Sequence, residues 1–120
     1  MREIKFRAWD REKEEIAKVT SINLEDYEVR MEDEECRCWS APYPYVCILM
    51  QWTGVKDKHE KEIYEGDIVK TKEDMGQIIY SKGMFFIDVE GDYLLPIYNV
   101  SEFMEVIGNI YENPELLKYE

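Results

Sequence analysis

The chain has 120 residues, of which 45% are hydrophobic, and its 27 acidic and 15 basic side chains give a formal net charge of −12. This length suits one domain, and the hydrophobic content excludes a disordered chain. Proteins that bind DNA or RNA gain affinity from lysine and arginine placed against phosphates, so a charge of −12 with no visible basic patch argues against nucleic-acid binding.

The first part of the chain, residues 1–50, is predicted to be β-rich. Ile4, Phe6 and Ala8 alternate with charged side chains, as expected for a strand with one buried face. Residues 16–22 follow a charged turn and are rich in β-branched side chains. The two segments together predict an N-terminal hairpin.

The sequence does not define the structure of residues 24–45. Tyr27, Val29 and Met31 alternate, which favours a short strand, and a helix is the alternative. The acidic turn that follows has two interpretations, because such clusters are usually solvated loops but can also meet a basic partner. The acids concerned are Glu32, Asp33, Glu34 and Glu35.

Aromatic side chains around two prolines form the other candidate partner surface. The segment SAPYPY holds an extended conformation, because the residue before a proline avoids the helical region. Trp39, Tyr43 and Tyr45 belong either to this surface or to the core. Trp52 follows an apolar run and is predicted to be core.

Residues 51–120 are predicted to form a small SH3-like barrel or sheet, because short strands alternate with turn residues. Ser81-Lys82-Gly83 predicts a hairpin turn with Gly83 at positive φ. Gly108 predicts a bulge or a close contact within a strand. Asn113 and Pro114 predict the start of a short C-terminal helix. The expected whole is a mainly β single domain.

The three cysteines do not suggest a metal centre. Cys36, Cys38 and Cys47 with the single His59 are a poor match to a structural zinc site, and an odd number of cysteines without an export signal predicts free thiols. Cys47 lies in an apolar run and is predicted to be buried, and His59 to be a solvated loop residue. We therefore expect no metal ion, no cofactor and no catalytic site.

No segment predicts a membrane partner. The longest apolar run near the centre, residues 45–50, is far shorter than the roughly 18 residues that a membrane-spanning helix needs. The N-terminal residues carry charge and lack the apolar stretch of an export signal. The expected location is the cytoplasm.

Three stretches resemble the YopX family of phage and prophage proteins: MREIKFRAWD, TGVKDKHEKEIYEGDIVK and EVIGNIYENPELL, which cover about a third of the chain. The family loop often carries Asn-Gly where this chain has His59-Glu60, so a looser turn is expected here. The resemblance implies a phage or prophage origin in a bacterial host cell and self-assembly into homo-oligomers. It supplies no catalytic residues.

The prediction for function is a non-enzymatic protein-interaction or assembly module, whose partner is a second copy of the chain or a host or phage protein. One alternative is an acidic inhibitor that mimics nucleic acid and occupies a host DNA-binding protein. The other is a hydrolase that uses paired carboxylates, for which the sequence offers no motif. The biological role and the size of the oligomer do not follow from the sequence.

Overall fold

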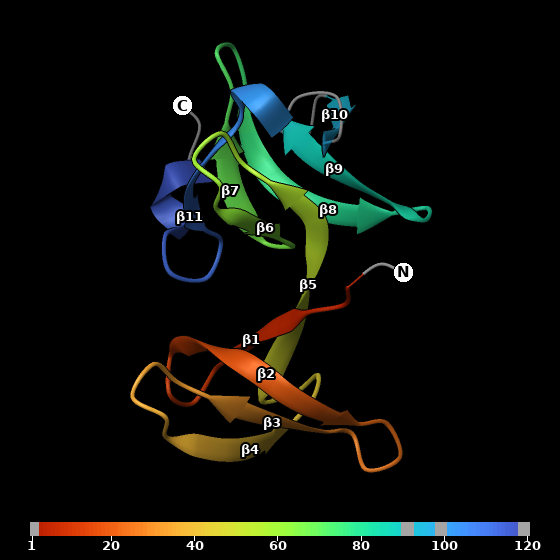
Figure 1. Ribbon diagram of the computed structural model, residues 1–120, viewed down its shortest axis with the longest axis vertical. Helices are drawn as coiled ribbons and strands as arrows, with labels where there is room; N and C mark the ends of the chain where they lie inside the picture. The colour runs from red at the N-terminus through yellow and green to blue at the C-terminus, as the bar shows by residue number, and fades with distance from the viewer. Residues whose placement is uncertain (1–2, 90–92, 98–100, 118–120) are drawn as a thin grey trace. The chain divides into compact units, whose positions relative to one another are not determined.

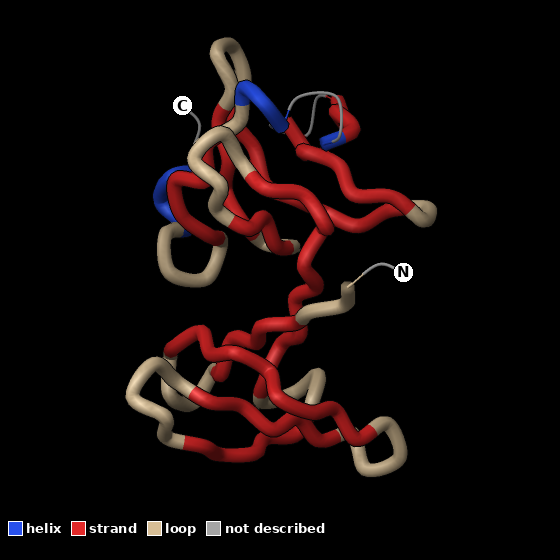
Figure 2. The backbone as a smooth tube through the Cα atoms, viewed as in Figure 1, coloured by secondary structure: helices blue, strands red, loops and turns tan. Residues whose placement is uncertain are grey.

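The computed structural model describes residues 3–89, 93–97 and 101–117, and almost all of its regular structure is antiparallel β-strand (Figures 1 and 2). The mainly β class predicted from the sequence is confirmed. The chain divides into two compact units, Ile4–Gln51 and Trp52–Glu120, the second together with Met1–Glu3. No helix in the described ranges has the length and apolar character needed to cross a membrane.

The N-terminal unit is an antiparallel sheet with the strand order β4-β3-β2-β1-β5. The predicted hairpin is confirmed, since the first two strands pair with Ala8 opposite Ala17. The strands are β1 (Phe6–Asp10), β2 (Glu15–Asn23), β3 (Glu28–Glu32), β4 (Cys38–Pro42) and β5 (Cys47–Lys56).

The core of this unit is built from small and medium side chains. It comprises Ala8, Ala17, Val29, Met31, Ala41 and Cys47. The alternation of Val29 and Met31 correctly predicted a strand with one buried face, and Cys47 is buried as expected. Ile4 was expected on the buried face but is 60% exposed, because β1 begins two residues later at Phe6.

The C-terminal unit contains the second half of β5, which pairs with β6 (Glu62–Tyr64), and a five-stranded antiparallel sheet. That sheet has the order β10-β9-β8-β7-β11, and it does not close into a barrel in the described part of the chain. The sequence predicted either a small SH3-like barrel or a sheet for residues 51–120, and the structure has a sheet. Its strands are β7 (Asp67–Lys70), β8 (Met75–Ser81), β9 (Met84–Val89), β10 (Tyr93–Pro96) and β11 (Glu105–Asn109).

One face of this sheet holds the second core, made of Ile63, Val69, Ile78, Ile87, Val89, Ile97 and Met104. In β9 the residues Ile87 and Val89 are buried, whereas Met84 is exposed on the opposite face. Successive side chains of β9 therefore point to opposite faces of the sheet, as in any strand with one buried face.

Two glycines stand where the fold needs them. Lys82 and Gly83 have φ values of 49° and 83°, which is the two-residue turn with both central residues left-handed that suits a β-hairpin. The pairing of β11 with β7 shifts register between Val106 and Gly108, so the predicted bulge is confirmed. A Cβ at Gly108 would lie 2.6 Å from Asn113 Oδ1, so the predicted close contact is present as well.

The predicted C-terminal helix is a single 3-10 turn, η3 (Pro114–Leu117). The carbonyl of Asn113 accepts the first helical hydrogen bond from Leu116 N–H at 3.1 Å, as expected of a capping position. Its side chain, however, accepts a hydrogen bond from Asn109 N–H at 3.2 Å and so belongs to the preceding turn. A second 3-10 turn, η2 (Ser101–Phe103), precedes β11.

Candidate partner-binding surface

β4 is an edge strand of the N-terminal sheet, and β3 is its neighbour in the described residues. Tyr43 N–H donates to Tyr27 O at 2.9 Å just beyond one end of the ladder. Hydrogen-bonded and non-hydrogen-bonded pairs alternate in an antiparallel ladder, so Trp39 and Ala41, in phase with Tyr43, direct their backbone groups toward β3. Cys38, Ser40 and Pro42 direct theirs away from the sheet, along an open edge.

The residues of this edge are suited to an exposed position. Pro42 has no N–H to leave unpaired, which is why proline is tolerated on the outer side of an edge strand. Its carbonyl accepts a hydrogen bond from Val46 N–H at 3.1 Å in the turn that follows. The backbone N–H and C=O of Ser40 remain directed outward. β4 contains no charged residue, although 35% of the chain is charged.

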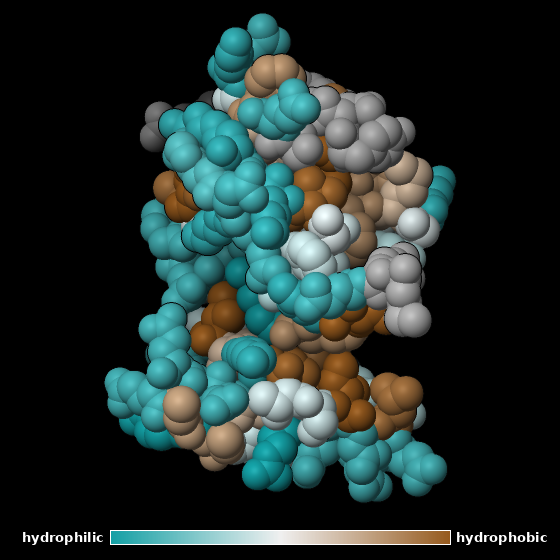
Figure 3. All heavy atoms as spheres, viewed as in Figure 1, coloured by the Kyte–Doolittle hydropathy of each residue, from teal (hydrophilic) through white to brown (hydrophobic). Residues whose placement is uncertain are grey.

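Exposed apolar and aromatic side chains lie at one end of β3 and β4. Leu24, Tyr27 and Tyr45 are 74%, 61% and 79% exposed. The rings of Tyr27 and Tyr43 pack with their centroids 5.8 Å apart and tilted by 53°. We call Leu24, Tyr27, Tyr43 and Tyr45 the tyrosine patch. In Figure 3 the visible face is mostly hydrophilic and is interrupted by clusters of apolar side chains.

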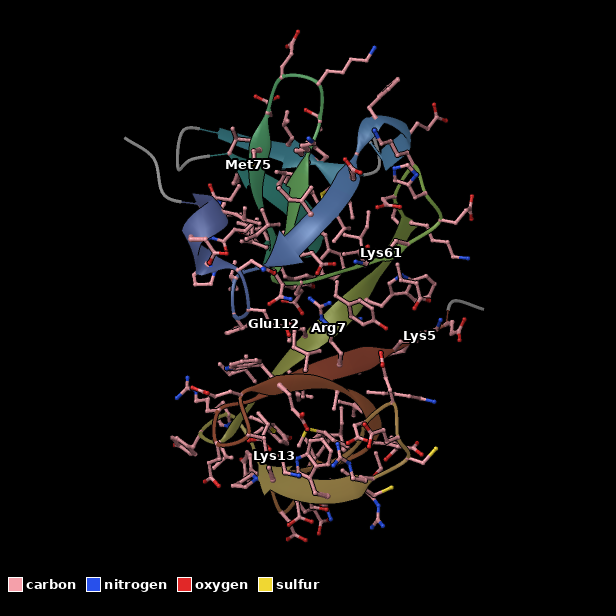
Figure 4. All side chains as sticks on the ribbon, turned by 90° about the vertical axis from the view of Figure 1, so that its left-hand side faces the viewer. Lys5, Arg7, Lys13, Lys61, Met75 and Glu112 are labelled. Atoms are coloured by element: carbon pink, nitrogen blue, oxygen red, sulfur yellow. The ribbon has the colours of Figure 1, made fainter. Side chains whose placement is uncertain are left out.

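Trp39, the third aromatic residue predicted for the partner surface, makes its contacts within the N-terminal unit. Its Nε1–H donates to Asp10 Oδ2 at 2.7 Å, and Lys13 Nζ lies 3.8 Å from the ring centroid. In Figure 4 the labelled Lys13 lies over β4. The other carboxylate oxygen of Asp10 accepts the N–H groups of Glu12 and Lys13, so this buried carboxylate joins the β1–β2 turn to β4.

The four predicted acids are not equivalent. Asp33 accepts hydrogen bonds from the N–H groups of Glu35 and Arg37 and from Arg37 Nε at 2.8 Å. These contacts, the Arg37 backbone N–H first among them, hold the pKa of Asp33 below its ordinary value even though burial opposes them. Glu32 is half-buried, and Glu34 and Glu35 are exposed. The acidic surface is therefore smaller than the sequence suggests.

The cysteines divide between surface and core, and the predicted burial of Cys47 is confirmed. Cys36 and Cys38 are exposed free thiols, and Cys47 is buried with its Sγ 3.8 Å from Ala41 O. Burial, assisted by the nearby negative charge of Asp10, raises the pKa of Cys47 to about 11. A thiol with so high a pKa is a poor nucleophile at neutral pH. No group of three or more His, Cys, Asp and Glu in the described ranges is arranged to hold a metal ion.

The loop that contains His59 is organised by a carboxylate that the sequence did not single out. Asp57 is buried, and it accepts the N–H groups of His59, Lys61 and Val106 at 2.8–3.0 Å. Burial acts to raise the pKa of Asp57, but these three hydrogen bonds outweigh it and lower the pKa. His59 is exposed, as predicted, and its Nε2 lies 3.3 Å from Glu105 Oε2.

Sequence reasoning missed Asp10 and Asp57 as organising residues, and it missed the exposure of Tyr27. Asp10 and Asp57 each precede a charged turn, and an aspartate in that position commonly accepts the N–H two residues on, which is the signal that was available. Tyr27 continues the alternation of Val29 and Met31, so the pattern predicts burial. β3 begins at Glu28, and Tyr27 lies in the preceding turn.

The fold is that of a small, mainly β protein with two open antiparallel sheets, in which the boundary between the two compact units falls within one long strand, β5. Residues 5–118 match the family model of the YopX protein, so the chain belongs to the YopX family. No curated protein matches it.

Two solved structures are similar to the chain along nearly its whole length. The first is protein EF1440 from Enterococcus faecalis, with 29% identity, a TM-score of 0.72, and coverage of 98% of this chain and 100% of that one. The second is protein yopX from Bacillus subtilis, with 25% identity, a TM-score of 0.62, and coverage of 95% and 98%.

Proposed function

We propose that the protein is a non-enzymatic assembly module that associates with further copies of itself through the open edge of β4 and the adjoining tyrosine patch. The observation that carries the proposal is the coincidence of an open, uncharged strand edge with four exposed or partly exposed apolar side chains. A phage or prophage origin, a cytoplasmic location and a host or phage partner remain predictions from the sequence and the family resemblance.

Strand edges recruit other strands because their N–H and C=O groups lack partners. Natural proteins usually guard such edges with lysine, other charges or proline. Here Pro42 guards one position, whereas Ser40 and Cys38 are left open and β4 carries no charge. Strand addition at this edge supplies backbone hydrogen bonds, and exposed tyrosines supply the contact area that is common in protein interfaces.

A second copy fits this edge better than a strongly charged partner does. Two β4 strands related by a twofold axis pair antiparallel and present the same residues to one another. Two chains of charge −12 repel, so the contact that costs least is the one with no acidic side chains at its centre. The uncharged sequence CWSAP meets that requirement.

The proposal is tested by measuring mass in solution with light scattering after size exclusion. We expect the unaltered chain to be oligomeric, Ser40→Pro to weaken association by removing an outward N–H, and Tyr45→Lys to weaken it by placing charge in the patch. Leu94→Lys is the matched control, because Leu94 is an exposed apolar residue on β10 of the other unit. A monomeric unaltered chain, or equal effects of Leu94→Lys and Tyr45→Lys, would contradict the proposal.

The two alternatives from the sequence receive less support. A nucleic-acid mimic needs carboxylates displayed to a partner, but Asp33 turns both of its oxygens inward to the loop and Arg37 offsets part of the remaining charge. For the hydrolase, the buried carboxylates of Asp10 and Asp57 accept hydrogen bonds that hold turns together.

A further inference from the structure

A hollow in the C-terminal unit collects basic side chains that are scattered in the sequence. Its volume is about 480 Å³, within the range of roughly 300–1,000 Å³ of small-ligand sites. It is lined by Lys58, Lys70, Thr71, Lys72, Glu102 and Phe103. The sequence shows no basic patch because these lysines come from the β5–β6 loop, the end of β7 and the β7–β8 turn. We call this site the lysine hollow.

The walls of the lysine hollow are held by backbone hydrogen bonds. Lys58 N–H donates to Met104 O at 3.0 Å, which ties the β5–β6 loop to the residue after Phe103. Thr71 N–H donates to Asp74 O at 2.8 Å, and Thr71 Oγ1 accepts Asp74 N–H at 3.1 Å. Met104 is fully buried and anchors this end of β11. The lysines therefore project from two fixed turns and a strand end.

The three ammonium groups are available to a ligand. Within the described ranges, no ion pair joins the side chain of Lys58, Lys70 or Lys72 to a carboxylate, although the chain has 27 acids. Among the residues that line the lysine hollow, Glu102 is the one acid. Three lysines and one acid line the hollow, so its lining carries a net positive charge.

An aromatic ring lies beside these charges. Phe103 is 53% exposed, and Lys72 Nζ lies 5.8 Å from its ring centroid. Phe103 also lines an adjoining hollow of about 280 Å³, with Thr71, Lys72, Glu73 and Asp74. Exposed aromatic rings next to lysine are the arrangement on which nucleic-acid bases stack while their phosphates are neutralised.

We propose that the lysine hollow binds a mononucleotide, with the phosphate held by the lysines and the base stacked on Phe103. Glu102, Glu73 and Asp74 limit the negative charge that the site accepts, which favours one phosphate group over a polyanionic strand. The net charge of −12 does not forbid this, because charges more than about 10 Å away are largely screened at 0.1 M salt. The proposal does not depend on self-association.

The test is calorimetric titration of the full chain at about 0.1 M ionic strength, where distant charges are screened, with AMP, adenosine and inorganic phosphate. We expect AMP to bind more tightly than either of the other two. Exposed charges contribute modestly, so Lys70→Gln combined with Lys72→Gln should weaken AMP binding about tenfold. Phe103→Ser should weaken binding of AMP several-fold and leave binding of phosphate unchanged.

Lys82→Gln is the matched control, because Lys82 is an exposed lysine in the β8–β9 turn and does not line the lysine hollow. It should bind AMP as the unaltered chain does. The absence of AMP binding, equal losses in Lys82→Gln and in the Lys70 and Lys72 double variant, or phosphate binding as tight as AMP binding would each overturn the proposal. Circular dichroism of every variant shows whether lost binding reflects lost folding, and a folded Phe103→Ser variant that binds AMP normally also overturns it.

Discussion

Short polar side chains stabilise several turns of this protein by accepting hydrogen bonds from backbone N–H groups. Asp10, Asp33 and Asp57 each accept backbone N–H groups two to four residues further along the chain, and Asn109 accepts those of Tyr111 and Glu112. Glu112, labelled in Figure 4, in turn accepts a hydrogen bond from Asn109 Nδ2 at 2.8 Å. Part of the chain's acidity therefore has a local structural use.

Replacing Asp57 should destabilise the loop that contains His59. Replacing Asp57 with Asn puts an amide nitrogen against one of three backbone donors, so we expect the free energy of unfolding to fall by roughly 2 kcal/mol. Because the pKa of folded Asp57 is below its ordinary value of 3.8, its stabilisation is complete above that pH and is lost as the pH falls through the folded pKa.

Urea unfolding at a series of pH values measures both effects. The loss of stability on acidification should be less steep in Asp57→Asn than in the unaltered chain. Glu60→Gln, an exposed change in the same loop, is the control. Its free energy of unfolding should fall on acidification as much as that of the unaltered chain. An Asp57→Asn variant that matches the unaltered chain at every pH would show that the carboxylate is not what organises this loop.

The pairing of strands depends on glycines that allow a neighbouring strand to approach closely, as well as on side chains that pack. Gly76 in β8 lies against β9, where a Cβ would collide with the Asp88 carbonyl oxygen and also meet Ile87 Cγ2 at 2.9 Å. Because this carbonyl belongs to the backbone, it cannot move aside as the end of a flexible side chain could. Among the described residues β4 pairs with β3 alone, so its other edge is open.

We expect Gly76→Ala to lower the free energy of unfolding by about 2 kcal/mol or more, as overpacking against a backbone does. Gln77→Ala is the neighbouring control on β8 and should have a smaller effect, since Gln77 is half-buried and a side chain is removed there. Urea denaturation of the two variants compares them directly. Equal stability of Gly76→Ala and the unaltered chain would mean that β8 and β9 can separate without loss.

At the scale of the whole molecule, net charge governs how copies meet. A chain of −12 repels a second copy, and added salt screens that repulsion. Binding of an anion in the lysine hollow depends on attraction, which salt weakens. The two proposals therefore have opposite dependences on ionic strength.

We expect the average mass from light scattering to rise as sodium chloride is added, over the range where AMP binding measured by calorimetry falls. Sodium chloride exchanged for an uncharged osmolyte of equal osmolality is the control, and it should leave AMP binding unchanged. Association that weakens with added salt would show that the interface depends on opposite charges, and would exclude the uncharged β4 edge as its centre.

Patterns that extend over a few neighbouring residues were sufficient to predict much of this fold. The alternation of Val29 and Met31 identified a buried face because successive side chains in a strand point to opposite sides of the sheet. Ser81-Lys82-Gly83 identified a hairpin turn because glycine reaches positive φ without strain. Charge alone argued against partners with many phosphates. The first two conclusions rest on the conformational preferences of neighbouring residues, and the third rests on composition.

The tertiary structure decided what lies at an edge and what converges in space. β4 is open because β3 pairs with one side of it, and Trp39 is occupied because Asp10, far away in sequence, accepts its N–H. Lys58, Lys70 and Phe103 meet only after three separate elements fold together. Such contacts join residues distant along the chain, and no local pattern records them, because their energies exist only once the chain has folded.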